Sequence, residues 1–454
     1  MRASPRSLLG DALAAAFLTA SDWGSAELVD MGARALGARS SWLVPLAKDV
    51  LRAFPSPPLH DLGALARFIA TDDRVRDACR SVSDSPRVRE WLVPSLAMGA
   101  ARWPVPQIAT AGDLASWIGV EAPALSWLAD ARGLERLVRD EGLRHYRYRW
   151  VAKRSGGVRL LEEPKERTKD IQRRILHEIL DVIPLHDAAH GFRRGRSVLS
   201  HASMHAGRYV VLRIDLSDFF SSITAAGVRA IFRALGYPAE VATMLAALCS
   251  NRAPPMPVDV EKRALGDYPS AADIDALRRT KMLVRAPHLP QGAPTSPAIA
   301  NLCAFGLDVR LAAAANAIGA TYSRYTDDLV FSGGVDVARR ARRFEAFVAA
   351  VVHDEGFAVN FRKTRVMRHG GQQRIAGLVV NDRARASRET FDRVKAILHN
   401  CVRHGAASQN REGRKDFRAY LYGLVAWIAT GDSARSERLT AMLGQIDWTV
   451  RQAP

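Results

Sequence analysis

The chain has 454 residues, of which 48% are hydrophobic, and it carries 65 basic against 47 acidic side chains for a net charge of +18. The chain is longer than the usual length of a domain with a single hydrophobic core, and its apolar content excludes a disordered chain. We therefore expect several globular domains. The four cysteines lie far apart without a CxxC pair, which indicates neither a disulfide framework nor a zinc site.

The positive charge is unevenly distributed along the chain. The first 120 residues contain 13 basic and 12 acidic side chains, so nearly all of the excess lies in the remainder. A field of this sign attracts polyphosphate and indicates a nucleic-acid partner, and the alternative is a basic surface that keeps the protein soluble. The apolar run near the N-terminus is interrupted by Asp11 and no 18-residue apolar span follows, so we expect a cytoplasmic protein without a membrane partner.

Residues 1–140 are rich in Ala, Leu and Trp at helical spacing. Proline clusters at 55–58 and 104–106 interrupt this pattern and predict two small helical units, either an adaptor or a packing collar. From residue 146 basic and aromatic side chains alternate as in a strand, and Gly156 and Gly157 separate this run from the next. A Gly-Gly pair between two such runs predicts a β-hairpin.

Three segments after the hairpin are predicted to be a helix, a strand and a surface insertion. Residues 168–183 predict an amphipathic helix, whereas the polar, proline-bearing residues 251–287 predict a surface insertion. Between them, residues 210–220 read as a buried strand that carries Asp215 at its C-terminal end.

Two further carboxylates interrupt the apolar stretch 322–331. Tyr325, Thr326, Asp327 and Asp328 stand where a strand pair should turn. Since neighbouring strands lie about 5 Å apart, this turn can meet the end of the Asp215 strand. Three such carboxylates would bind Mg²⁺, and two ions there activate an attacking 3′-oxygen and stabilise the leaving pyrophosphate. The alternative is that Asp-Asp is ordinary turn chemistry.

The remaining chain adds three motifs and a helical end. Residues 289–297 form a proline-rich loop that leads into a helix opening with small side chains, and 360–364 and 374–381 are two short polar and apolar segments. Helices are predicted at 388–401, 417–430 and 436–446.

These ordered motifs resemble the reverse transcriptases, and among them the bacterial retron-type branch, over about residues 140–450. The resemblance implies an α+β right-hand polymerase with fingers, a palm with an antiparallel sheet and a helical thumb, preceded by an all-α extension. The corresponding domains are residues 1–140 for the helical extension, 141–380 for fingers and palm, and 381–454 for the thumb.

The resemblance also assigns the catalytic residues. Asp215, Asp327 and Asp328 match the aspartates that hold the metal in this family, which implies two Mg²⁺ ions, or Mn²⁺ in their place. Lys363 matches the lysine that approaches the leaving pyrophosphate and can donate a proton there.

The dNTP site follows from the same resemblance. Lys153 and Arg159 match the cations of the fingers hairpin that hold the triphosphate. Phe220 matches the aromatic steric gate that excludes a 2′-hydroxyl and so favours dNTPs. Phe219 is expected to pack in the core, because adjacent strand residues face opposite ways.

Four more residues match positions next to the nucleotide, template or primer. Gln291 and Gly292 match the loop that lies against the incoming nucleotide and the template, where glycine permits close backbone approach. Tyr325 is expected beside the primer end, and Gly377 lies in the segment that grips it.

The chain differs from the usual retron pattern at three places. Retron enzymes usually carry Asn-Ala-x-x-His before the first catalytic strand, where this chain has His201 and His205 at its ends. They usually carry Val-Thr-Gly where this chain has Ile375 and Ala376 before the glycine, and Ala where it has Thr326. The two histidines can be read as a metal pair, but we expect them to contact backbone or RNA because no third ligand is evident.

The sequence therefore predicts an RNA-directed DNA polymerase in a retron-like element of antiphage defence. Its expected partners are a structured noncoding RNA as template and primer, the DNA product and an effector protein. The first alternative is a defence reverse transcriptase outside the retrons, with protein-primed or untemplated DNA synthesis. The second is a non-catalytic RNA-binding scaffold, which the intact aspartates disfavour.

Overall fold

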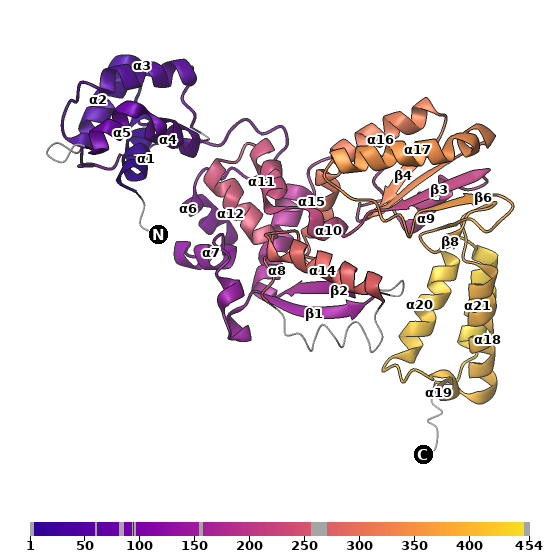
Figure 1. Cartoon of the computed structure of the whole chain (residues 1–454). Coiled ribbons are helices and arrows are strands. Elements are labelled where there is room, and N and C mark those ends of the chain that lie inside the picture. Colours follow the sequence, from indigo (N-terminus) through magenta and orange to yellow (C-terminus); the bar gives the residue numbers. More distant parts are fainter. Residues whose placement is uncertain are drawn as a thin grey trace. The chain divides into compact units, whose positions relative to one another are not determined.

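The computed structural model describes residues 4–59, 61–80, 86–92, 94, 97–153, 158–255 and 270–448. The chain folds as two compact units, each built from two segments of the sequence (Figure 1). Unit 1 contains Met1–Ile183 and Ile223–Ser296, and unit 2 contains Pro184–Ser222 and Pro297–Pro454. Helices alternate with three antiparallel sheets, which confirms the α+β class.

Five N-terminal helices of unit 1 share one hydrophobic core. They are α1 (Pro5–Phe17), α2 (Ser25–Leu36), α3 (Leu43–Ala53), α4 (Leu62–Thr71) and α5 (Asp73–Arg80). Helix α1 packs closely on α4, because a Cβ at Gly10 would lie 2.7 Å from the Ala66 carbonyl oxygen. The prolines at 55–58 therefore join α3 to α4 inside one core, and the predicted division at this point is wrong.

The rest of unit 1 surrounds a β-hairpin. Strands β1 (Tyr146–Ala152) and β2 (Val158–Pro164) pair antiparallel as predicted, while the Gly-Gly turn at 154–157 lies outside the described residues. Helix α14 (Ala271–Arg285) packs Leu277 and Val284 against this hairpin. The prediction of a surface insertion at 251–287 is thus wrong for α14, and residues 256–269 lie outside the described part.

The other elements of unit 1 are short helices. They are α6 (Ala111–Ile118), α7 (Ala122–Ala129), the 3₁₀ turns Glu135–Leu137 and Glu141–Leu143, α8 (Glu166–Ile175) with a π-helical continuation Leu176–Leu180, α11 (Ala225–Ala234) and α12 (Ala239–Cys249). An ion pair of 3.1 Å between Arg233 on α11 and Asp61 joins this part to the N-terminal helices.

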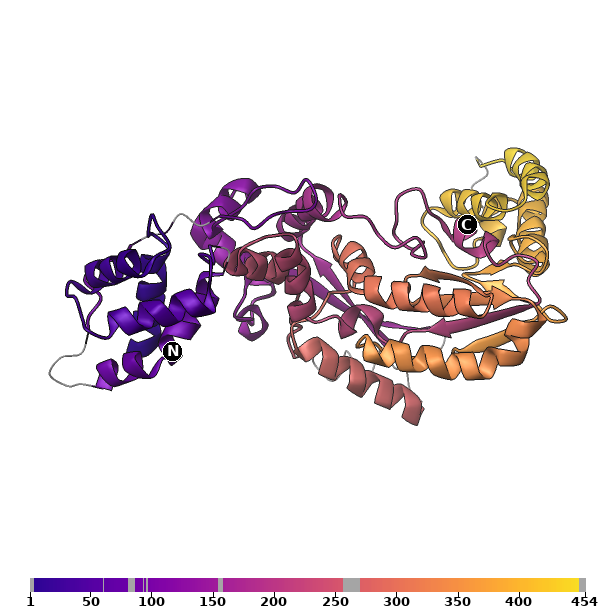
Figure 2. The same ribbon diagram turned by 90° about the horizontal axis from the view of Figure 1, so that it is seen from above.

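Unit 2 is organised around a four-stranded antiparallel sheet in the order β4-β5-β3-β6. The strands are β3 (Val210–Asp215), β4 (Thr321–Tyr325), β5 (Asp328–Gly333) and β6 (Arg365–Arg368). Helices α16 (Phe305–Ala317) and α17 (Val335–Asp354) lie side by side along one face of this sheet (Figure 2).

Strand alternation places the polar residues of the sheet on the opposite face. Asp215 pairs with Asp328 and Arg213 with Val330, so these side chains share one face, whereas Ile214 and its neighbours point toward the helices. The carboxylates therefore stand on the face of the sheet that points away from α16 and α17.

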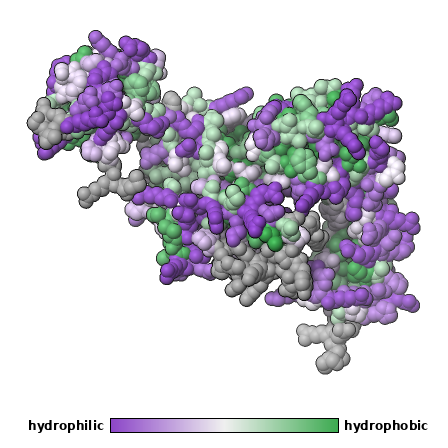
Figure 3. Space-filling view, in the orientation of Figure 1, coloured by the Kyte–Doolittle hydropathy of each residue, from purple (hydrophilic) through white to green (hydrophobic). Residues whose placement is uncertain are grey.

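The C-terminal part of unit 2 is a helical bundle with a core of its own. Its helices are α18 (Arg388–His404), α19 (Ala406–Gln409), α20 (Phe417–Ala429) and α21 (Ser433–Gly444). The short elements before it are α9 (Val198–Ser203), α10 (Phe219–Ser222), α15 (Ser296–Cys303), β7 (Arg374–Ile375) and β8 (Leu378–Val379). Hydrophilic residues cover much of the visible surface of the N-terminal and C-terminal helices (Figure 3).

Among the described helices, none is by itself long and apolar enough to cross a membrane. The bent pair α15 and α16, with 51° between its members, meets that test of length and composition only when taken together.

Candidate active site

The turn between β4 and β5 contains only two residues, Thr326 and Asp327, and Tyr325 pairs with Asp328 across it. Thr326 has φ 61°, a left-handed conformation that a β-branched residue rarely adopts. Gly191 packs against this turn so closely that a Cβ there would lie 2.7 Å from the Thr326 nitrogen. Packing from a distant segment therefore helps to hold the turn in its strained shape.

A buried arginine supports the same turn from the helix-covered face of the sheet. The Arg324 guanidinium donates to the Asp308 carboxylate at 2.8 and 2.6 Å, and both side chains are fully buried. One of its nitrogens also donates to Asn301 Oδ1 at 2.9 Å and to the Thr326 carbonyl at 3.0 Å. The turn is thus hydrogen-bonded to a fixed charge that cannot move without breaking a buried ion pair.

The backbone brings the three predicted aspartates together. Asp215 ends β3 directly opposite Asp328, the first residue of β5. The Leu216 amide donates to the Asp327 carbonyl at 2.8 Å, so the chain continues alongside the turn. The structure therefore brings Asp215 to the same sheet edge as Asp327 and Asp328, which follow it by more than 100 positions in the sequence.

Two cations and an amide contact these carboxylates. Arg213 donates to both oxygens of Asp328 at 2.8 Å. Lys363 Nζ lies 3.1 Å from Asp215 Oδ1, and Asn360 Nδ2 donates to the same oxygen at 3.0 Å. The predicted proton donor Lys363 is thus within hydrogen-bonding distance of the first predicted metal ligand.

Among the residues that the structure describes, none forms an ion pair with Asp327, and the pKa of this carboxyl is raised. Burial raises the pKa of Asp327 to about 6, with further increases from the charges of Asp328 and Asp215. Burial also raises the pKa of Asp328, against the opposing effect of Arg213. Three carboxylates are therefore gathered at this edge against two cations, Lys363 and Arg213.

This donor set fits a hard divalent cation such as Mg²⁺, which binds carboxylate oxygens and relieves the repulsion between them. Within the described ranges, no three carboxylate, imidazole or thiolate groups are arranged as a closed metal cluster. The contacts explain this, because Asp215 and Asp328 are oriented toward Lys363 and Arg213. The residues that would hold the ion are present at one edge, and two of them, Asp215 and Asp328, are paired with the protein's own cations.

The two phenylalanines after Asp215 differ in exposure. Phe219 is buried against the rings of Phe357 and Phe220, with centroids 5.4 and 5.6 Å away, while Phe220 is half-buried. Phe219 is the core residue, as expected, but the alternation of side chains along a strand is not the cause. The strand has already ended at Asp215, and both residues belong to the helical turn α10.

In unit 1, the predicted nucleotide loop is attached to the hairpin. The Glu162 amide donates to the Gln291 carbonyl at 2.9 Å, and a Cβ at Gly292, where φ is 139°, would lie 2.7 Å from the Glu162 carbonyl oxygen. Gly292 is thus required for close approach to the protein's own strand. The Glu162 carboxylate is itself buried and accepts from His288 at 2.8 Å.

The two predicted triphosphate cations lie on the same hairpin. Arg159 is exposed on β2 opposite Val151, and Lys153 directly follows β1. Unit 1 therefore contains the predicted cations and nucleotide loop, and unit 2 contains the carboxylates.

The histidine pair is entirely internal. His205 hydrogen-bonds Ser332 Oγ through Nδ1 and Ser323 Oγ through Nε2, both at 2.7 Å, and His201 Nδ1 lies 2.7 Å from Ser323 Oγ. Both rings are fully buried, so the expectation of contacts with backbone or RNA is wrong. Burial lowers the pKa of His201 to about 2 and that of His205 to about 3, which keeps both neutral.

The two predicted primer residues lie in unit 2. Tyr325 is half-buried, with its ring 5.6 Å from that of His201. Gly377 has φ 89° in the turn between β7 and β8, where a Cβ would lie 3.3 Å from Trp427 of α20. Ile375 and Ala376 replace the Val and Thr of the usual Val-Thr-Gly motif. The glycine is kept at position 377, where the positive φ and the packing against Trp427 favour it.

Comparison with known proteins identifies the family. Residues 151–381 match the model of the reverse transcriptase (RNA-dependent DNA polymerase) family. The retron Mx65 reverse transcriptase of Myxococcus xanthus is 41% identical over 77% of this chain and 74% of its own length. The chain belongs to the retron-type reverse transcriptases.

A second relative and a solved structure are also similar to this reverse transcriptase. The retron Mx162 reverse transcriptase of Myxococcus xanthus is 34% identical over 77% of this chain and 69% of its own length. A foamy viral protease–reverse transcriptase solved with double-stranded DNA has a TM-score of 0.31 at 15% identity, over 68% of this chain and 45% of that one. As a member of the family, the protein is an RNA-directed DNA polymerase.

The sequence analysis did not identify four residues that surround the catalytic edge of the reverse transcriptase. Arg213 and Arg324 are cations inside strands of which most residues are buried, which is the signal that could have shown them to be paired. Asn360 belongs to a motif that was noticed only for its lysine. Asp308 gave no signal, because its partner lies 16 residues away across a helix–strand contact.

Proposed function

We propose that this reverse transcriptase extends a 3′-hydroxyl on an RNA template with dNTPs, using two divalent metal ions held by Asp215, Asp327 and Asp328. The observation that carries the proposal is the register that sets Asp215 opposite Asp328, with Asp327 in the adjoining turn. Such ions, when bound, activate the attacking oxygen and stabilise the leaving group.

The residues around the carboxylates have distinct proposed tasks. Lys363 holds a proton next to Asp215 and donates it toward the leaving pyrophosphate. Arg213 orients the Asp328 carboxylate through two bonds from one fixed guanidinium. Asn360 orients Asp215 in the same way, so that neither carboxylate has to be ordered when substrate binds.

Substrate selection is proposed for the hairpin, the loop and α10. Lys153 and Arg159 bind the triphosphate, and Gln291 lies against the base pair on a loop that Gly292 attaches to β2. Phe220, the less buried of the two α10 phenylalanines, excludes the 2′-hydroxyl. Tyr325 and the Gly377 turn contact the primer end.

The experiment that tests catalysis uses a primed RNA template, dNTPs and Mg²⁺. Replacement of both turn carboxylates, Asp327→Asn with Asp328→Asn, should abolish incorporation because the charge that binds the metal is removed. Asp336→Asn is the control, since Asp336 is exposed on α17 and, among the described residues, pairs only with the likewise exposed Arg339. Undiminished incorporation by the double variant would show that the assigned carboxylates are not catalytic.

We further propose a retron-like setting: a cytoplasmic enzyme that copies a structured noncoding RNA into DNA linked to that RNA, together with an effector protein in antiphage defence. Similarity to the Mx65 and Mx162 reverse transcriptases supports this setting. Sequencing the nucleic acid that copurifies with the protein tests it. A branched RNA–DNA molecule supports the retron-like product, whereas DNA joined to a tyrosine supports the protein-primed alternative.

A further inference from the structure

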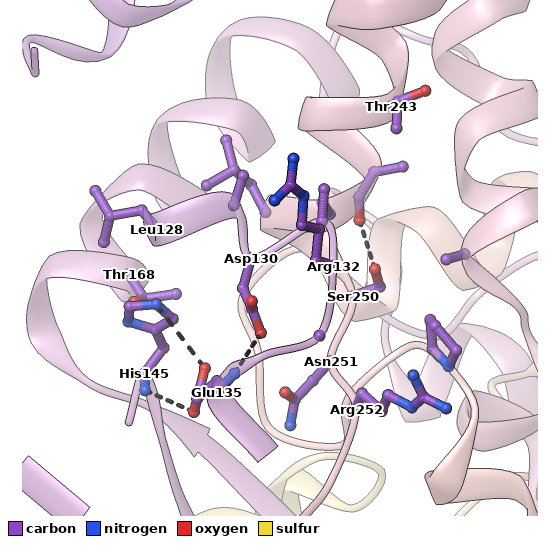
Figure 4. Close-up of a pocket in the computed structure, with 18 of the residues that line it drawn as sticks. Leu128, Asp130, Arg132, Glu135, His145, Thr168, Thr243, Ser250, Asn251 and Arg252 are labelled. Atoms are coloured by element: carbon purple, nitrogen blue, oxygen red, sulfur yellow. Dashed lines mark hydrogen bonds and ion pairs between the residues drawn. The ribbon is translucent and has the colours of Figure 1, made fainter. Parts of the chain in front are cut away.

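Unit 1 contains two adjoining hollows on the side of α11 and α12. The first has a volume of about 220 Å³ and lies between the loop after α7, the start of β1 and the two helices (Figure 4). The second has a volume of about 520 Å³ and is bounded partly by α4 of the N-terminal helices. Ala226, Arg229 and Thr243 line both, so the two hollows adjoin at these residues.

Five arginines line these hollows, and the four other than Arg233 are here called the arginine track: Arg67, Arg229, Arg252 and Arg132. Arg67, Arg132 and Arg229 are exposed, and Arg252 is half-buried, with its Nε donating to the Arg285 carbonyl at 2.7 Å. In the part of the chain that the structure describes, none of the four forms an ion pair with a carboxylate.

The carboxylates that line the hollows are already hydrogen-bonded or paired. Asp130 accepts from the Leu134 and Glu135 amides at 2.8 and 3.0 Å, and Glu135 accepts from the His145 amide at 2.7 Å (Figure 4). Burial raises the pKa of Glu135, and its Oε2 lies 3.9 Å from His145 Nε2. In the second hollow, Asp61 is paired with Arg233.

An extended anion with regularly repeated charge matches this arrangement. The shared Arg229 places positive charge at the junction of the hollows, with further arginines on either side. The Trp127 ring is 48% exposed and packs edge-on against His145 of the first hollow, with centroids 4.3 Å apart. Cations that follow a backbone beside an aromatic face are how proteins bind single-stranded nucleic acid.

We propose that the arginine track is a second nucleic-acid site of this protein, which binds a single-stranded segment of the RNA template or of the DNA product through its phosphates. The hollows accept unpaired nucleotides, whose bases are free to enter a concave surface, whereas a duplex presents only its backbone there. The N-terminal helices thereby contribute Arg67 to nucleic-acid binding. The proposal requires only that the chain bind nucleic acid, and it holds whether or not the retron-like product is formed.

The test measures binding by the full chain without dNTPs, so its outcome does not depend on catalysis. Fluorescein-labelled oligo(U) and oligo(dT) are titrated at several salt concentrations, and the two probes distinguish template from product. Arg132→Gln with Arg229→Gln should weaken binding and lower the slope of log K against log salt by about 1.4, because each phosphate contact on a single strand contributes about 0.7.

The matched control removes the same charge elsewhere. Arg340→Gln with Arg342→Gln changes two exposed arginines on α17 that have no ion pair in the described structure, and this should leave the slope unchanged. Equal slopes for the two double variants would overturn the proposal. Displacement of both probes by poly-glutamate at matched charge would also overturn it, because an acidic peptide would then be the better ligand.

A second variant tests the hollows without changing charge. Ala226 is exposed at the junction of both, so Ala226→Trp should block the hollows and weaken binding several-fold at an unchanged thermal unfolding temperature. Binding as tight as that of the unsubstituted protein would show that nucleotides do not enter the hollows. RNA carrying 4-thiouridine should crosslink to residues 127–135 or 225–233, and crosslinks only outside these segments would contradict the site.

Discussion

The buried pair of Asp308 and Arg324 allows a quantitative prediction about the catalytic turn. Asp308→Asn keeps the shape of the side chain but leaves the Arg324 guanidinium in a fully buried site without a counter-charge. Removing one partner of a buried ion pair destabilises a protein by about 3–5 kcal/mol. For a domain of this size, about 2–4 °C of melting temperature corresponds to 1 kcal/mol, so the unfolding transition of unit 2 should fall by roughly 6–20 °C.

The assay is thermal unfolding together with dNTP incorporation below the new transition. Incorporation should also fall, because the same guanidinium donates to the Thr326 carbonyl in the turn. Asp354→Asn is the control: Asp354 pairs with Arg310 at 3.0 Å on an exposed surface, where a pair contributes about 0–1 kcal/mol. Equal shifts for the two variants would refute the reasoning that burial decides the effect.

Two further predictions concern the palm and the substrate. His201 and His205 are neutral in the folded state, because their pKa values are lowered, whereas the pKa of an unfolded histidine is about 6.5. Below pH 6.5 the unfolded state therefore binds more protons than the folded state. The unfolding free energy measured by urea titration should accordingly fall from pH 7 to pH 5, by up to about 1.4 kcal/mol per pH unit for each ring. His205→Gln should reduce this pH dependence, and an unchanged dependence would contradict the assignment. Phe220→Ala should lower the preference for dNTP over rNTP by roughly 10- to 100-fold, the range in which a pocket rejects an added hydroxyl. Phe347→Ala, at an exposed position on α17, should not change this ratio, and equal ratios for both variants would remove Phe220 from the gate.

The local elements of the sheet could be predicted because their signals are local. A run of buried residues ending in Asp215 gives a strand with a carboxylate at its end, and two residues between apolar runs give a hairpin. The register that sets Asp215 opposite Asp328 follows once both strands are placed on one face, because slipping by one residue would turn every side chain over.

Tertiary packing decided the features that the sequence did not predict. The prolines at 55–58 interrupt helices without separating cores, since α1 and α4 pack across them. The two histidines are polar residues four apart, which is equally consistent with a surface or a metal site. Only the positions of Ser323 and Ser332 on neighbouring strands show that the rings have partners inside the sheet.

The two faces of the sheet contribute differently to the catalytic turn. On the helix-covered face, Arg324 is neutralised by Asp308 and is free to hold the Thr326 carbonyl. On the opposite face, the three carboxylates of Asp215, Asp327 and Asp328 stand against two cations, Lys363 and Arg213, and burial together with the neighbouring carboxylates raises the pKa of Asp327. Rigid support from one side lets the turn keep three carboxylates close together, because the backbone cannot relax to separate them. The three neighbouring carboxylates therefore favour the binding of a divalent cation at this edge.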